Sequence, residues 1–172
     1  MSLSYYFEFR APAEETPEAL EHFLKDVETY AASVGFKPTV VLNVPFDTRE
    51  RREFSHRLGS SFTVQDDRLK GGTIPNPQQV RSHDPVAGEC RLIPERGVVL
   101  VVTDERGCEV CFGFFKFPEA IVDIHGKIIT ETGLGTAWSY RDFVNIPDQR
   151  YRDIVGGFVT AGYAKCVKDE YA

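Results

Sequence analysis

Two pairs of histidine and aspartate residues are the first candidates for chemistry in this sequence. Asp123 and His125 are two positions apart, so on a β-strand their side chains would project from the same face. A carboxylate beside an imidazole can orient the ring for general-base catalysis or form one edge of a metal site. His83 and Asp84 could supply a third and a fourth group. These residues define one hypothesis, a small acid/base or metal-assisted enzyme; the competing interpretation places Asp123 and His125 in a hairpin turn.

Cys108 and Cys111 have the spacing of a redox pair or of half a zinc site. A second ligand pair at zinc-site spacing is missing, and Cys90 and Cys166 are isolated. A redox C-x-x-C opens a helix, whereas this one begins an expected strand, on which residues three apart point to opposite faces. We therefore expect packing cysteines and no metal site. Walker, G-x-G-x-x-G, G-x-S-x-G and H-E-x-x-H motifs are absent as well, so no cofactor is expected.

Trp138, Tyr140, Arg141 and Asp142 combine flat aromatic surface with a planar cation. Such groups stack on ligands, bind anions and anchor protein interfaces. The alternative is an aromatic plug under the last helix, with Arg141 paired to an acid. The cluster is the predicted ligand- or partner-binding site of this chain.

The stretch from Lys70 to Gly88 has three glycines, three prolines and almost no apolar periodicity. Irregular loops of this length are uncommon inside compact domains and are either binding loops or mobile segments without a binding role. With the tryptophan cluster, this loop supports the first functional hypothesis, a non-enzymatic module that binds a protein partner or a small ligand.

Charge and composition narrow the class of protein. The chain has 172 residues, a formal charge of −6 and 42% hydrophobic residues, which is typical of a globular domain with a sizeable core. Four arginines between Arg49 and Arg57 alternate with acids, which indicates a self-paired helix face and not a basic surface. We therefore expect no nucleic-acid partner. No secretory signal or apolar run of membrane-spanning length is visible, so we expect a soluble cytoplasmic protein with reduced thiols and no membrane contact.

The elements that must position these residues centre on Val98–Phe117. Two apolar runs flank the polar connection Asp104–Gly107, which predicts a central hairpin buried on both faces. The most secure helix covers about 17–34, because Thr16 is a good N-cap, Pro17 suits the first turn and Gly35 suits the end. A second main helix is expected over about 147–167, where Gly156 and Gly157 suggest close packing or a kink.

The remaining patterns predict shorter elements. We expect strands at 5–10, 39–44, 62–65 and 90–93, a hairpin of 121–124 with 127–130, and a short helix near 48–58. Together they indicate an α+β fold: one domain over 1–172, with a mixed, mainly antiparallel sheet and both main helices on one face.

The central hairpin also carries apolar side chains on its second face, at Cys111, Phe115 and Phe117. We expect the long loop or another subunit to cover them, and on this basis predict a homodimer.

Overall fold

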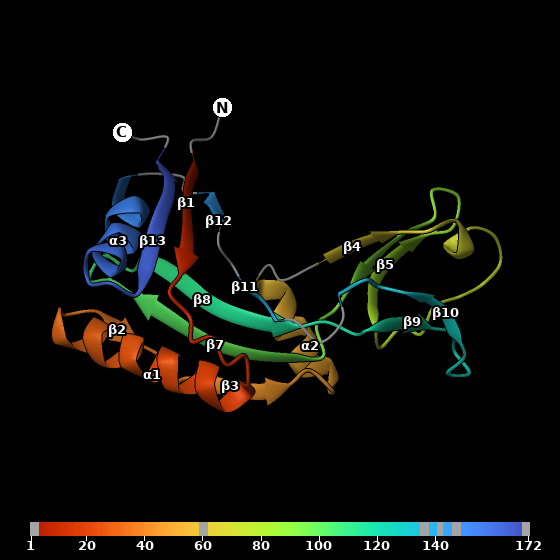
Figure 1. Cartoon of the computed structure of the whole chain (residues 1–172), viewed down its shortest axis with the longest axis horizontal. Helices are drawn as coiled ribbons and strands as arrows, with labels where there is room; N and C mark the ends of the chain where they lie inside the picture. Colours follow the sequence, from red (N-terminus) through yellow and green to blue (C-terminus); the bar gives the residue numbers. More distant parts are fainter. Residues whose placement is uncertain (1–3, 59–61, 135–137, 141–142, 146–148, 170–172) are drawn as a thin grey trace. The chain divides into compact units, whose positions relative to one another are not determined.

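The computed structural model describes residues 4–58, 62–134, 138–140, 143–145 and 149–169. It confirms the α+β class, with helices and several antiparallel sheets (Figure 1). The chain divides into two compact units. Unit 1 comprises Met1–Asn43, Val98–Phe114 and Tyr140–Ala172, and unit 2 comprises Val44–Gly97 and Phe115–Ser139. That residues 1–172 form one domain remains a prediction.

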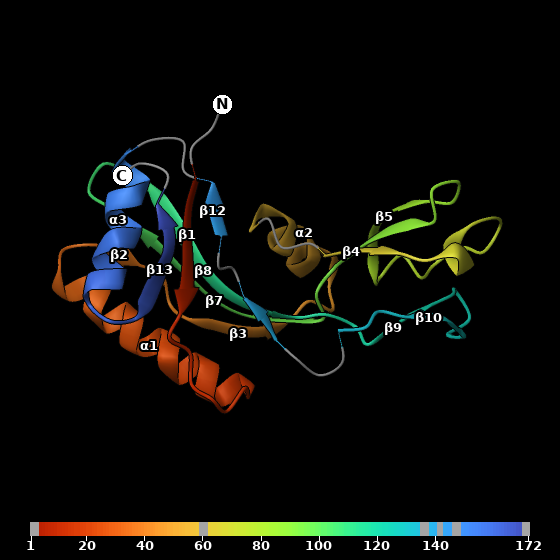
Figure 2. The same ribbon diagram turned by 45° about the horizontal axis from the view of Figure 1, so that its top comes forward.

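Unit 1 joins two helices to a small antiparallel sheet, as Figure 2 shows. The sheet has the order β12-β1-β13 and consists of β1 (Ser4–Phe9), β12 (Phe143–Asn145) and β13 (Ala164–Asp169). The helices are α1 (Pro17–Ser33) and α3 (Gln149–Thr160). The predicted central hairpin is β7 (Arg96–Thr103) with β8 (Glu109–Lys116); these strands run from one unit into the other in the sheet β11-β8-β7-β2. β2 is Lys37–Pro38 and β11 is Ser139–Tyr140.

Helix α1 begins and packs as its sequence predicts. The Thr16 hydroxyl accepts a hydrogen bond from the Ala19 amide at 3.1 Å, which satisfies one of the free N–H groups of the first turn. Gly35, with φ of +90°, follows the helix end. The apolar stripe of helix α1 is buried and comprises Leu20, Leu24, Val27 and Ala31.

Both main helices contact the same face of β8, as predicted. Phe112 and Phe114 share this face and are fully buried. The Phe114 ring lies 6.0 Å from Phe23 of α1, and the Phe112 ring lies 4.7 Å from Phe158 of α3, between ring centroids. Phe9 of β1 contacts both Phe112 and Phe114. This phenylalanine cluster is the core of unit 1.

The prediction that the last helix reaches residue 167 is wrong. α3 ends at Thr160, and 164–169 form β13. Gly162 adopts φ of +91°, which turns the chain so that β13 can pair with β1. Nothing lies within 4 Å of a Cβ built on Gly156, so close packing does not account for that glycine. The Tyr30 hydroxyl donates to the Gly157 carbonyl at 3.3 Å.

The described residues of unit 2 form one α-helix and two small antiparallel sheets. The helix is α2 (Arg49–Arg57). The sheet β4-β6-β5 consists of β4 (Phe62–Gln65), β5 (Val80–Asp84) and β6 (Glu89–Leu92), and a 3₁₀ turn, η1 (Asp67–Leu69), follows β4. The second sheet is the predicted hairpin, β9 (Ala120–Val122) with β10 (Ile128–Glu131). Strand β3 (Leu42–Pro45) starts later than the predicted 39–44 and pairs with β7.

The long loop is more ordered than its composition predicts, because Val80–Asp84 within 70–88 forms β5 and pairs with β6.

The phenylalanines on the second face of the central hairpin are covered by other residues of unit 2. Phe115 stacks on Phe46 at 6.5 Å and Phe117 contacts Phe62 at 5.9 Å, between ring centroids. Covering these two rings therefore needs no second subunit.

Gly97 of β7 makes room for the Phe46 ring. A Cβ at this position would lie 2.6 Å from Cζ of Phe46, closer than side-chain atoms approach in real proteins. The backbone of Phe46 is also held in place, since its amide donates to the Glu95 carbonyl at 2.8 Å.

Among the described residues, no helix is long and apolar enough to cross a membrane.

Candidate functional site

Asp123 and His125 lie in the turn between β9 and β10 and not on a strand face. Oδ1 of Asp123 accepts the amide N–H of His125 at 2.8 Å and that of Lys127 at 2.9 Å. The bond from the Lys127 amide is the main cause of a pKa below the usual carboxyl value at Asp123. His125 is exposed at the tip. The aspartate thus closes the turn, as the alternative interpretation has it, and the imidazole faces solvent.

His83 and Asp84 lie at the end of β5. Oδ1 of Asp84 accepts the amides of Val86 and Ala87 at 3.1 and 3.2 Å, so this carboxylate also closes a turn. Nε2 of His83 lies 2.9 Å from the Leu69 carbonyl oxygen. Across the described part of the chain, no group of three or more His, Cys, Asp or Glu side chains is arranged to hold a metal ion.

The predicted binding cluster is described only in part. Trp138 is 7% exposed, so its ring packs inside the protein. Tyr140 belongs to β11, and Arg141 and Asp142 lie outside the described residues. None of the four cysteines forms a disulfide, and burial raises the pKa of Cys90 to about 11, which makes that thiol a poor nucleophile.

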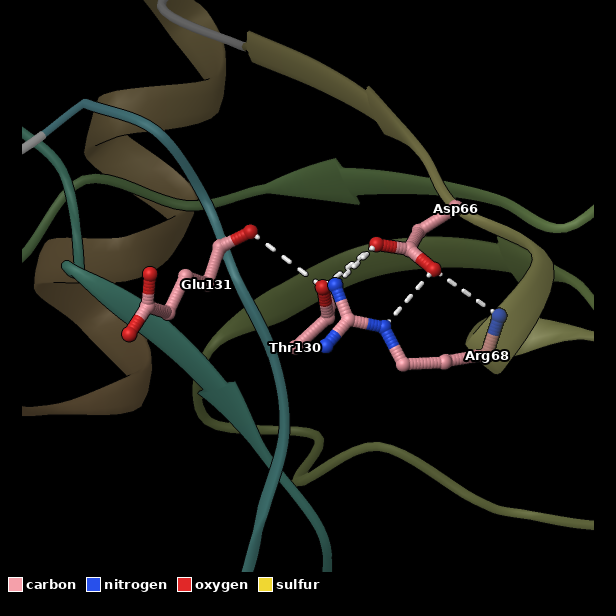
Figure 3. Close-up of polar contacts among 4 residues, drawn as sticks. All are labelled: Asp66, Arg68, Thr130 and Glu131. Atoms are coloured by element: carbon pink, nitrogen blue, oxygen red, sulfur yellow. Dashed lines mark hydrogen bonds and ion pairs between the residues drawn. The ribbon is translucent and has the colours of Figure 1, made fainter.

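A cluster that the sequence did not predict centres on Asp66, between β4 and η1 (Figure 3). Its carboxylate binds Arg68 through both oxygens: Nε donates to Oδ1 at 3.0 Å and one terminal guanidinium nitrogen donates to Oδ2 at 2.8 Å. The Arg68 amide donates to Oδ1 at 2.9 Å, and the buried Thr130 hydroxyl donates to Oδ2 at 2.5 Å. The side-chain carboxylate of Glu131 points away from Asp66 and Arg68. Four donors therefore converge on one carboxylate.

These bonds favour the charged form of Asp66. The Arg68 side chain contributes most, followed by Thr130, and the pKa of Asp66 falls far below its ordinary value. The Asp66 amide also donates to the Gly88 carbonyl at 3.0 Å, beside the turn that follows β5. Asp66 thus ties η1 to two neighbouring segments, the Gly88 turn and β10. The arrangement stabilises the fold of unit 2. Both carboxylate oxygens of Asp66 accept hydrogen bonds within it.

The Asp66 cluster holds the inner, buried face of strand β10, because the Thr130 side chain lies on that face. Thr130 pairs with Ile121 of β9, and both side chains are fully buried. A third strand-like segment continues this face: Pro75, which is buried, forms an antiparallel bridge with Asp123. The Asn76 amide extends the pairing with a 2.9 Å hydrogen bond to the Val122 carbonyl.

Three exposed isoleucines lie on or beside this small sheet. Ile128 of β10 pairs with Val122, Ile124 lies in the turn after Asp123, and Ile74 precedes Pro75, which bridges to Asp123. Ile74, Ile124 and Ile128 are 64%, 58% and 62% exposed. We call these three residues the isoleucine face. Ile121, Thr130 and Pro75 of this small sheet are thus buried, whereas the described residues leave the three isoleucines exposed.

Sequence reasoning missed both features for physical reasons. Asp66 and Thr130 are 64 positions apart, so no local pattern joins them. Ile74 lies in a stretch without periodicity, and only the bridge at Pro75 brings it beside the hairpin. One local signal existed: Ile124 and Ile128 flank an expected turn, where apolar residues are unusual.

Comparisons with protein-family models, with curated proteins and with solved structures give no match for this chain.

Proposed function

We propose that this chain is a non-enzymatic binding module and that the isoleucine face is its protein-binding surface. The observation that carries the proposal is the exposure, each above half, of Ile128 on β10, Ile124 in the turn before it and Ile74 beside the Pro75 bridge. Adjacent exposed apolar side chains mark interaction sites, whereas single ones are ordinary. Apolar small molecules prefer concave sites, so an exposed apolar surface better suits the surface of another protein.

The support of β10 makes this surface suitable for binding. The hydrogen bond from Thr130 to Asp66 holds the inner face of β10, so Ile128 on the outer face is presented by an ordered strand. A surface that is ordered before binding loses less conformational entropy when the partner arrives. The Asp66 cluster therefore has a positioning role in this proposal.

The partner we propose is a second copy of the chain, which makes the module a homodimer. In a symmetric dimer the same patch meets itself, so a two-fold axis through the isoleucine face would bring the exposed isoleucines of the two copies together. The register of β10 shifts between Ile128 and Thr130, and such a bulge disfavours addition of a strand at the edge, so we propose contact through the face.

A reducing compartment, such as the cytoplasm, is part of this proposal, because none of the four cysteines forms a disulfide. No nucleic-acid or membrane partner is proposed. No observation on the described residues favours the acid/base or metal-assisted enzyme, since Asp84 and Asp123 each accept two backbone amides.

Light scattering on the purified chain at micromolar concentration tests the proposal. The expected result is a dimer in the wild type and a monomer in Ile124→Thr/Ile128→Thr. Val167→Thr is the matched control, because Val167 is also exposed, at 57%, but lies in unit 1. A monomeric wild type would refute the homodimer. Equal association of the wild type and the double variant would refute the isoleucine face.

A further inference from the structure

Three exposed arginines of unit 2 form no ion pair with any described residue. Arg49, Arg51 and Arg68 form ion pairs with Glu53, Asp47 and Asp66 at 3.2, 3.3 and 2.8 Å. In contrast, Arg57, Arg81 and Arg91 are exposed and form no ion pair with any described residue. The self-paired face predicted for 49–57 is thus confirmed for Arg49 and Arg51 but not for Arg57, and Arg81 and Arg91 lie outside this segment.

Arg91 lies at the centre of a polar row on the sheet β4-β6-β5. Its cross-strand partners are Thr63 of β4 and Ser82 of β5. The neighbours of Arg91 on its own strand, Cys90 and Leu92, are fully buried, so Arg91 and its two partners share the opposite, outer face. All three are exposed. Side chains at directly paired positions are close enough to contact one ligand together.

Arg81 adds a second cation next to this row. It immediately precedes Ser82, at the point where the register of β5 shifts, and it acts electrostatically on His56 of α2. Burial first, and then the positive charge of Arg81, lower the pKa of His56, while Glu53 opposes the change. Because Arg81 is the extra residue at the register shift beside the pair of Ser82 with Arg91, two positive charges occupy neighbouring positions, and a bound anion would relieve their repulsion. Glu89, two residues before Arg91 on the same face, is the acidic neighbour that would oppose binding.

We propose that this outer face is a binding site for a phosphate group, with Arg91 and Arg81 as charged donors and Thr63 and Ser82 as hydroxyl donors. A tetrahedral phosphate has several acceptor oxygens and suits donors that converge from neighbouring strands. Arginine forms paired hydrogen bonds with such oxygens, and hydroxyl groups complete the set. This site is separate from the isoleucine face and does not depend on the proposed homodimer.

Nuclear magnetic resonance of the arginine side-chain Nε–H groups tests the site. The wild-type chain is titrated with inorganic phosphate and, separately, with a mononucleotide, both at constant ionic strength. We expect saturable shifts at Arg81 and Arg91 and none at Arg49, which is already paired. Saturation with both probes assigns recognition to the phosphate group; saturation with the mononucleotide alone means that base or sugar contacts are required and overturns the phosphate site as described.

Matched variants separate a site from general screening. Arg91→Gln should abolish the saturable shift of Arg81, and Glu89→Gln should tighten binding, because it removes the opposing charge. Arg49→Gln, which alters a paired arginine on α2, should leave the titration unchanged. Parallel, non-saturating shifts at Arg49, Arg81 and Arg91 would show general ion screening only and would overturn the proposal, as would the absence of any shift.

Discussion

The side-chain hydroxyl of Thr130 donates a 2.5 Å hydrogen bond to Oδ2 of Asp66, which lies 64 positions earlier in the chain. This bond joins the inner face of β10 to the segment between β4 and η1. Because the same strand presents Ile128 on its outer face, the bond links the internal polar cluster of unit 2 to the proposed binding surface.

Thr130→Val should lower the free energy of unfolding by about 1 to 2 kcal/mol, because the variant keeps the side-chain shape and removes one hydrogen bond to a charged acceptor. Thr63→Val, on exposed β4, is the control and should change stability little. Urea unfolding of both variants measures the difference. Equal stability of Thr130→Val and the wild type would show that this bond contributes nothing to the fold.

The pH dependence of stability should report on Asp66. Its carboxyl pKa is lowered in the folded protein, chiefly by Arg68, from an ordinary value of 3.8. The stabilisation is therefore complete above that ordinary value and is lost as the pH falls toward the folded-state pKa. Urea unfolding between neutral and acidic pH should show a smaller loss of stability in Asp66→Asn than in the wild type. Parallel profiles would contradict this role.

Gly97→Ala should destabilise unit 2 by about 1 to 3 kcal/mol, the usual cost of overpacking a core. The added Cβ would lie 2.6 Å from the Phe46 ring, which is 3% exposed and has little room to move. Gly72→Ala is the matched control, since no atom lies within 4 Å of its built Cβ and its φ is not positive. Chemical denaturation compares the two; a neutral Gly97→Ala would mean that Phe46 repacks freely.

Gly156→Ala should act in the opposite direction and stabilise α3 by about 1 kcal/mol, since alanine has the higher helix propensity and no neighbour is within 4 Å. Gly162→Ala should instead destabilise, because Gly162 has φ of +91°. Thermal unfolding of the pair provides the comparison. A destabilised Gly156→Ala would reveal a role for this glycine beyond its helix.

Local patterns predicted the parts of the fold that depend on near neighbours. Helix α1, with its Thr16 cap, and the hairpin β7–β8 are examples in which sequence spacing determines the contacts. The end of α3 was mispredicted because apolar residues of β13 continue a helical spacing, and only pairing with β1 makes them a strand. Tertiary contacts override periodicity in such segments.

The candidate surface depended on distant contacts in the same way. The spacing of two between Asp123 and His125 would place both side chains on one face of a strand, yet Asp123 closes its own turn. The isoleucine face needs Ile74 to meet a hairpin about fifty positions away, and neither composition nor spacing encodes that meeting.

Methyl resonances of isoleucine test the central claim most directly, because they report on each face of the small sheet separately. On raising the concentration of the isotope-labelled chain, the methyl groups of Ile74, Ile124 and Ile128 should shift together and saturate. Those of Ile121 and Ile154, which are 0% and 2% exposed, should not. Concentration-dependent shifts that spare the isoleucine face, or no shift at any concentration, would contradict a homodimer formed through this surface.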